Sequence, residues 1–243
     1  MAVFRMKIAG RVGEITSLFE STRDYCKAYL TEDAPDFTAA VTPEDLAFEQ
    51  EALRLEALEE GMKFRRFTDP FLDRAAIQRK FADFLFDHDT LLFHGSTVAV
   101  DGRAYLFTAA CGTGKSTHTR LWRQVFGDRA VMVNDDKPFL RLTENGVLAC
   151  GAPWSGKHGL DSNITVPLAG ICILERGSEN IIHPIAPEEA RPRLLHEAHC
   201  PDGLESRFRE LVARLAEHVP LWRMECTKDP QAAIVAFEAM SKV

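Results

Sequence analysis

The segment Ala109–Thr117, Ala-Ala-Cys-Gly-Thr-Gly-Lys-Ser-Thr, constrains the fold more than any other part of the sequence. A loop that binds phosphate must direct several backbone N–H groups at one point, so it needs residues that tolerate unusual dihedral angles. Gly112 and Gly114 meet this need. Lys115 adds an ammonium group for the terminal phosphates, and Ser116 places a hydroxyl where Mg²⁺ would bind. The segment therefore predicts most of a P-loop.

The first glycine of G-x-x-x-x-G-K-[ST] is replaced by Ala109, so the flanking sequence must decide between a P-loop and an ordinary loop. Ala104–Thr108 is a short apolar run that predicts a strand, and Ser116–Phe126 has apolar residues at helical spacing. Strand, glycine-rich loop and helix follow one another as phosphate binding requires. The predicted nucleotide-binding residues are Gly112, Thr113, Gly114, Lys115, Ser116 and Thr117.

A second signal is the apolar strand Val131–Val133, which ends in Asn134-Asp135-Asp136, with Asp135 lying 20 residues after Lys115. In P-loop enzymes an acidic residue near this position holds Mg²⁺. Adjacent side chains on a strand point to opposite sides, so one carboxylate should face the metal and the other a substrate hydroxyl. We assign Asp135 as the general base and Asp136, with Ser116, as the metal ligands. The alternative is a solvent-exposed turn with local Asx capping.

Composition limits the class of protein. The 243 residues, 46% of them hydrophobic, suffice for one large core with an elaborated N-terminal part. A net charge of −7 argues against a nucleic-acid partner. The sequence has no long apolar segment and no signal-peptide pattern, which predicts a cytoplasmic protein without a membrane partner. The cysteines are scattered without a C-x-x-C pair, so neither zinc nor a disulfide framework is expected.

Local patterns divide the chain into an α+β lead-in over residues 1–89, packed on a core that covers 90–243. In the lead-in we expect a helix from about Thr16 to Leu30 and another over Glu44–Glu60. The core is expected to start with one strand, Leu91–Val100, and to continue as mostly strands as far as Ile185. Helices are expected near the C-terminal end.

Phe93-His94-Gly95, followed by the Gly112–Ser116 loop and then by Asn134–Asp136, resembles the HPr kinase/phosphorylase branch of the phosphoenolpyruvate carboxykinase-like P-loop fold. The resemblance covers about residues 90 to 185. It implies an α/β (α+β) core with a mixed, partly antiparallel sheet. It also implies a catalytic set in which His94 lies near the phosphates, Lys115 binds the triphosphate, and an Asp at position 135 or 136 is the base.

Two departures distinguish this chain from true HPr kinases. Val166–Gly170 stands where those proteins resemble one another in an acidic-x-Arg-Gly segment, and their long N-terminal regulatory domain has no expected counterpart. The loop Gly151–His158 looks instead like that of small HPr kinase-like proteins, which include kinases of free serine and of peptides. Its candidate acceptor-site residues are Trp154, Ser155, Lys157 and His158, although a purely structural loop is also possible.

The sequence therefore predicts an ATP- and Mg²⁺-dependent kinase whose acceptor is a hydroxyl of a small, serine-like metabolite or of a peptide. Two alternatives stay open, a regulatory module that binds ATP without transferring phosphate and an HPr-type protein serine kinase/phosphorylase. The identity of the acceptor and the oligomeric state are not predicted.

Overall fold

The computed structural model describes residues 1–59, 61, 63–110 and 112–242, which form two compact units, Met1–Asp87 and His88–Val243. Glu60, the predicted last residue of a helix, and Cys111 of the glycine-rich loop lie outside the described residues. Within the described residues, no helix combines the length and the apolar character needed to span a membrane.

The first unit contains a three-stranded sheet in the order β1-β2-β3. Its elements are β1 (Ala2–Ile8), β2 (Arg11–Ser17), α1 (Glu20–Tyr25), the 3-10 helix η1 (Lys27–Tyr29), β3 (Phe37–Ala40), α2 (Pro43–Glu59) and α3 (Asp69–Phe86). β1 and β2 are antiparallel, and β3 is parallel to β2. Asp73 on α3 is completely buried and accepts hydrogen bonds from the hydroxyls of Ser17 and Thr22, which ties the helix to the end of β2.

The helix predicted from Thr16 to Leu30 is wrong over its first residues. Thr16 belongs to β2, and only Glu20–Tyr25 and the short η1 are helical. The cause is the turn at Ala9 and Gly10, whose φ angles of 50° and 82° return the chain directly along β1. The ladder to β1 then holds the following residues extended.

The second unit is built on a nine-stranded sheet. Its strands are β4 (Thr90–Leu92), β5 (Ser96–Val100), β6 (Arg103–Thr108), β7 (Ala130–Asn134), β8 (Phe139–Thr143), β9 (Gly146–Cys150), β10 (Thr165–Arg176), β11 (Ile181–Pro184) and β12 (Leu221–Cys226). Its helices are α4 (Lys115–Phe126), α5 (Pro187–Glu197), α6 (Glu205–His218) and α7 (Gln231–Met240), with 3-10 turns η2 (Gly127–Arg129) and η3 (Gly156–His158).

The order of the strands brings several carboxyl ends to one edge of the sheet. The order is β4-β8-β9-β10-β6-β5-β7, and β12 joins β10. β10 is parallel to β6 and β12, while β5 is antiparallel to both β6 and β7. β6, β7, β10 and β12 therefore all end at the same edge. This is a mixed α/β architecture with a partly antiparallel sheet, as the sequence predicts.

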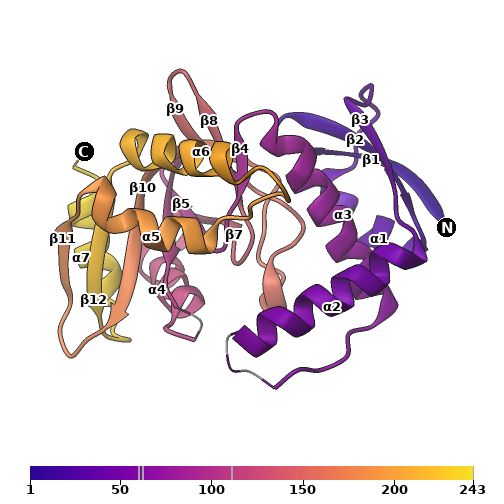
Figure 1. Ribbon diagram of the computed structural model, residues 1–243. Helices are drawn as coiled ribbons and strands as arrows, with labels where there is room; N and C mark the ends of the chain where they lie inside the picture. The colour runs from indigo at the N-terminus through magenta and orange to yellow at the C-terminus, as the bar shows by residue number, and fades with distance from the viewer. Residues whose placement is uncertain (60, 62, 111, 243) are drawn as a thin grey trace. The chain divides into compact units, whose positions relative to one another are not determined.

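Helices cover both faces of this sheet, with α5 and α6 drawn in front of it and α4 and α7 behind it in Figure 1. The core between the sheet and α4 is aromatic. Trp122 of α4 contacts Tyr105 and Phe107 of β6 and Phe237 of α7. These contacts fix the start of α4 next to the end of β6.

The single strand predicted over Leu91–Val100 is wrong, because β4 and β5 are separate strands with Phe93-His94-Gly95 between them. β4 pairs with β8, whereas β5 pairs with β6 and β7. The intervening backbone bonds elsewhere, with Phe93 N donating to the Pro138 carbonyl and Gly95 N to the Asp136 carbonyl. The crossing between two parts of the sheet places His94 at the carboxyl edge.

Candidate functional site

The glycine-rich loop connects the end of β6 to the start of α4. Gly112 and Gly114 have φ angles of 72° and 130°, which L side chains rarely adopt. A Cβ atom at Gly112 would have no atom within 4 Å, so there is open space over this part of the loop. Lys115 Nζ donates to the Ala109 carbonyl at 3.1 Å and lies at the amino end of α4. Free N–H groups and the helix dipole make such an end favourable for an anion.

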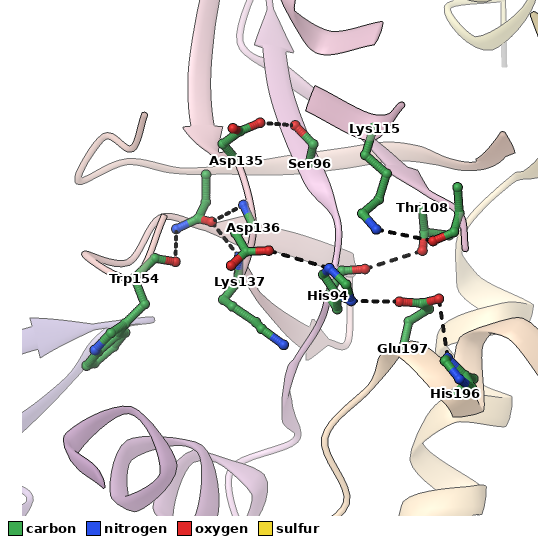
Figure 2. Close-up of polar contacts among 12 residues, drawn as sticks. His94, Ser96, Thr108, Lys115, Asp135, Asp136, Lys137, Trp154, His196 and Glu197 are labelled. Atoms are coloured by element: carbon green, nitrogen blue, oxygen red, sulfur yellow. Dashed lines mark hydrogen bonds and ion pairs between the residues drawn. The ribbon is translucent and has the colours of Figure 1, made fainter. Parts of the chain in front are cut away.

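Asp135 lies beside this loop. Its side chain is buried and accepts a hydrogen bond from Ser96 Oγ at 2.7 Å, drawn in Figure 2. Ser96 Oγ is also 2.7 Å from Thr119 Oγ1 of α4. Burial raises the pKa of Asp135, and the hydroxyls of Ser96 and Ser116 and the charge of His158 oppose this only in part.

Asp136 belongs to a different cluster, formed with His94 and Glu197 (Figure 2). His94 Nε2 is 3.4 Å from Asp136 Oδ1, and His94 Nδ1 is 3.0 Å from Glu197 Oε2. Burial acts to raise the pKa of Glu197, but His94, Arg193 and the charge of Lys115 outweigh it and lower this pKa to about 2. A buried carboxylate therefore holds the imidazole that faces Asp136.

Glu197 belongs to the site although no sequence pattern pointed to it. It lies at the end of α5, where its carbonyl accepts a hydrogen bond from His94 N at 2.8 Å. Its carboxylate is also 3.0 Å from Arg193 Nη1 on the same helix. No local motif surrounds Glu197, because its partner His94 lies far earlier in the sequence.

Asn134 is a second residue with a role that the sequence did not assign. Its side chain is completely buried. Its Oδ1 accepts from the backbone N–H groups of Asp136 and Lys137 at 2.8 and 2.6 Å, and its Nδ2 donates to the carbonyls of Ala152 and Trp154 at 2.7 and 3.2 Å. It therefore joins the turn that carries Asp136 to the loop after β9.

That loop contains the predicted acceptor-site residues, and the structure divides them into two pairs. Trp154 and Ser155 are buried, with the Ser155 hydroxyl donating to Asp161 Oδ1 at 2.6 Å. Lys157 and His158 are exposed on η3. The preceding residue of η3, Gly156, lies against Asp136, because a Cβ atom there would be 3.1 Å from the Asp136 Cβ. The exposed pair is thus next to the carboxylate cluster.

Backbone hydrogen bonds hold the two ends of this loop next to each other and next to β7. Gly151 N donates to the Ile164 carbonyl at 2.9 Å, and Ser162 N donates to the Val133 carbonyl at 3.2 Å. A Cβ atom at Gly151 would lie 1.8 Å from the Ser162 carbonyl oxygen. Only glycine at position 151 allows the two ends of the loop to approach this closely.

The oxygen donors near the glycine loop suit a hard cation. Among the described residues no group of three or more His, Cys, Asp and Glu side chains could hold a metal ion. Mg²⁺ in phosphoryl-transfer sites commonly uses only one or two carboxylates, with phosphates and water completing its shell. Asp135 could provide one such carboxylate, and the Ser116 hydroxyl could provide a further oxygen ligand. Strand alternation separates the Asp135 and Asp136 side chains without showing which one faces the loop, so the pairing of Ser116 with Asp136 as metal ligands stays a prediction.

The described residues therefore define a mixed α/β protein with a glycine-rich strand-loop-helix unit. At one sheet edge, Asp135 lies among hydroxyl groups, and Asp136 and Glu197 lie on either side of His94. No model of a known protein family and no curated protein matches the sequence. A solved structure of the HPr(Ser) kinase/phosphatase from Coxiella burnetii is similar at 11% identity and a TM-score of 0.39, covering 62% of this chain and 97% of that one. This similarity is distant, and the roles proposed below depend on this chain's own residues.

Proposed function

We propose that this chain is a kinase that transfers the γ-phosphoryl group of ATP to the hydroxyl of a small acceptor, with Mg²⁺ as cofactor. The observation that carries the proposal is the placement of the carboxylates. Asp135 is linked through Ser96 to Thr119 of α4, and the Ser116 hydroxyl at the start of α4 acts to lower the pKa of Asp135, while Asp136 faces His94 and the exposed η3 turn. One carboxylate thus lies on the donor side and its neighbour on the acceptor side.

The donor side is formed by the glycine loop and the first turn of α4. Lys115 would leave the Ala109 carbonyl and reach the β- and γ-phosphates, and the N–H groups at the amino end of α4 would bind their oxygens. Asp135 and Ser116 would hold Mg²⁺, which neutralises charge on the phosphates when it is bound. This assignment exchanges the roles that the sequence suggested for the two aspartates.

The acceptor side is formed around Asp136. Its carboxylate would take the proton of the acceptor hydroxyl as the acceptor oxygen forms its bond to the γ-phosphorus and the bond between the γ-phosphorus and the bridging oxygen breaks, so that ADP leaves. His94 lies next to the carboxylate on one side, and the hydrogen bonds that Asn134 Oδ1 accepts from Asp136 N and Lys137 N fix the turn. Such fixed geometry is the main contribution that a protein makes to phosphoryl transfer.

The acceptor would bind against η3. Lys157 and His158 are exposed and offer positive charge or hydrogen-bond donors next to Asp136, which suits a serine-like metabolite or a peptide with a carboxylate. Trp154 and Ser155 support the loop from within. A small acceptor is favoured because the candidate contacts come from one short turn.

Matched aspartate variants test this division. We expect Asp136→Asn to lower kcat by about 10²- to 10⁴-fold with ATP affinity retained, because it removes the proton acceptor and keeps the shape. Asp135→Asn should instead weaken Mg²⁺-dependent ATP binding. Calorimetry with and without Mg²⁺ measures affinity, and ADP release in the presence of pooled hydroxyl metabolites measures turnover. Equal effects of both variants on both quantities would contradict the division.

The glycine loop alone also supports a second candidate, a regulatory module that binds ATP without transferring phosphate. Such a module would bind ATP with saturation and release no ADP with any metabolite pool or with HPr. Phosphorylation of HPr by the purified protein, at a rate above that for small acceptors, would favour the protein-kinase alternative over the small-acceptor proposal.

A further inference from the structure

An open cavity of about 420 Å³ lies beside the glycine loop, and its wall on β10 has no part in the roles described so far. Its lining residues are Ala110, Thr113, Ile173, Leu174, Glu175, Arg176 and Arg193. They come from the loop itself, from the carboxyl end of β10 and from α5. The volume falls within the roughly 300–1,000 Å³ range of sites for small organic ligands.

Two arginines give this cavity its chemistry. Arg176, at the end of β10, donates from Nη2 to the Gly112 carbonyl at 2.6 Å. Arg193 of α5 bonds to Glu197, so its guanidinium is held in place at the cavity wall. A guanidinium group is planar, stacks on aromatic rings, and donates to ribose or phosphate oxygens.

The cavity also has an apolar part. Ile173 is 6% exposed and lies between Cys172 and Leu174, which belong to the aromatic core around Trp122. Alternation along β10 therefore directs Ile173 to the opposite face, where it lines the cavity. A free phosphate or sulfate needs no apolar wall, whereas a nucleobase does.

The order of the strands gives the direction of a bound nucleotide. Both aspartates follow β7, which lies beyond β5 on one side of β6, and the cavity lies at β10 on the other side. A γ-phosphate directed at Asp136 leaves the rest of the nucleotide to extend across the glycine loop toward β10. We propose that this cavity binds the base and ribose of the phosphoryl donor, with Arg176 and Arg193 as its polar contacts. This inference rests on the proposed function.

The test compares ATP with inorganic tripolyphosphate, which has the phosphates and no nucleoside. Both ligands are titrated with Mg²⁺ into the full chain by calorimetry. Ile173→Phe narrows the cavity without touching the loop, and we expect it to lower ATP affinity at least about tenfold while tripolyphosphate affinity changes less than about twofold. Arg176→Ala should lower ATP affinity by about tenfold, which lies within the range for a lost guanidinium–ring contact.

Arg123→Ala is the matched control for loss of positive charge. Arg123 is exposed on α4 and lies eight residues, about 12 Å along the helix, from Lys115. It should leave the affinities for both ligands unchanged. Thermal unfolding shows whether Ile173→Phe is folded, and Arg176→Ala keeps the question decidable if it is not.

Three results would overturn the inference in different ways. Unchanged ATP affinity in Ile173→Phe and Arg176→Ala would show that the nucleoside lies elsewhere. Equal losses for ATP and tripolyphosphate in both variants would make the cavity part of a phosphate site. If the wild-type chain binds neither ligand, the proposed kinase function fails first and the nucleoside site fails with it.

Discussion

His118 makes the second unit sensitive to mild acid. It lies on α4 with only 2% of its surface exposed, and its Nε2 accepts a hydrogen bond from Trp122 Nε1 at 3.1 Å. Burial lowers the pKa of His118 from 6.5 to about 3, because a charged imidazole has no compensating partner in this core. The ring is therefore neutral in the folded protein at any pH above about 3.

The size of the effect follows from proton linkage. The folded-state pKa is depressed, so between pH 6.5 and about 3 the unfolded chain binds a proton that the folded chain does not. The stability is complete above pH 6.5 and is lost as the pH falls. Each pH unit below 6.5 lowers the free energy of unfolding by about 1.4 kcal/mol, so His118 should cost about 2 kcal/mol at pH 5.

His118→Gln isolates this effect, since the amide oxygen can still accept from the Trp122 indole and does not titrate. The three tryptophans, Trp122, Trp154 and Trp222, all lie in the second unit, so their fluorescence reports its unfolding in urea. Between pH 7 and 5 the wild type should lose about 2 kcal/mol more than the variant. Between pH 7 and 8 the two proteins should respond alike.

The result that would refute this reasoning is a parallel loss of stability in both proteins between pH 7 and 5. That outcome would mean that His118 is charged in the folded state or that water reaches it. Carboxylates do not disturb the comparison, because their contribution is common to both proteins and cancels in the difference.

Four further changes have defined outcomes. Lys115→Ala should abolish Mg·ATP binding in calorimetry and change the free energy of unfolding by less than about 0.5 kcal/mol. Glu197→Gln removes the anion that holds His94, so kcat should fall while the KM for ATP is kept. The folded-state pKa of Glu197 is lowered to about 2, so the ionised side chain stabilises the fold above about pH 4.5, and this stabilisation is lost toward pH 2. Its size is on the order of 1–2 kcal/mol after solvent screening. Acid titration of the wild type against the variant will measure it. Lys157→Ala should raise the KM of an anionic acceptor about 10- to 100-fold with the KM of ATP unchanged in steady-state assays. Gly151→Ala should lower the free energy of urea unfolding by at least about 2 kcal/mol, because its methyl group would overlap the Ser162 carbonyl.

The parts of the fold that depend on local pattern were predictable from sequence. α4, for example, starts at Lys115, one residue before the predicted Ser116, because its apolar spacing and Gly127 are both local signals. The break at His94 was not predictable. Apolar residues stand on both sides of His94-Gly95, at Leu91–Phe93 and Val98–Val100, and the pairing of the two halves with different strands divides the segment.

The candidate site was predictable in its residue types and less so in its geometry. The positions of Asp135 and Asp136 follow from the strand, but their assignment to the two sides depends on how β7 is rotated in the sheet. Glu197 and Arg176 reach the site from elements that follow it in the chain, and neither carries a recognisable motif. Long-range pairing of this kind leaves no trace in one sequence.

The close backbone crossing at Gly151 determines which residues of the loop after β9 can change. Since the crossing with Ser162 and the bond to Ile164 fix both ends of the loop, the exposed Lys157 and His158 between them can be exchanged without altering the frame that holds Asn134 and Asp136, whereas Gly156 packs against Asp136. The exposed part of η3 can thus vary in charge while the residues that hold Asp136 stay constant. Under the proposed kinase function, a change of charge at Lys157 and His158 should alter which acceptor is selected and leave nucleotide binding unchanged.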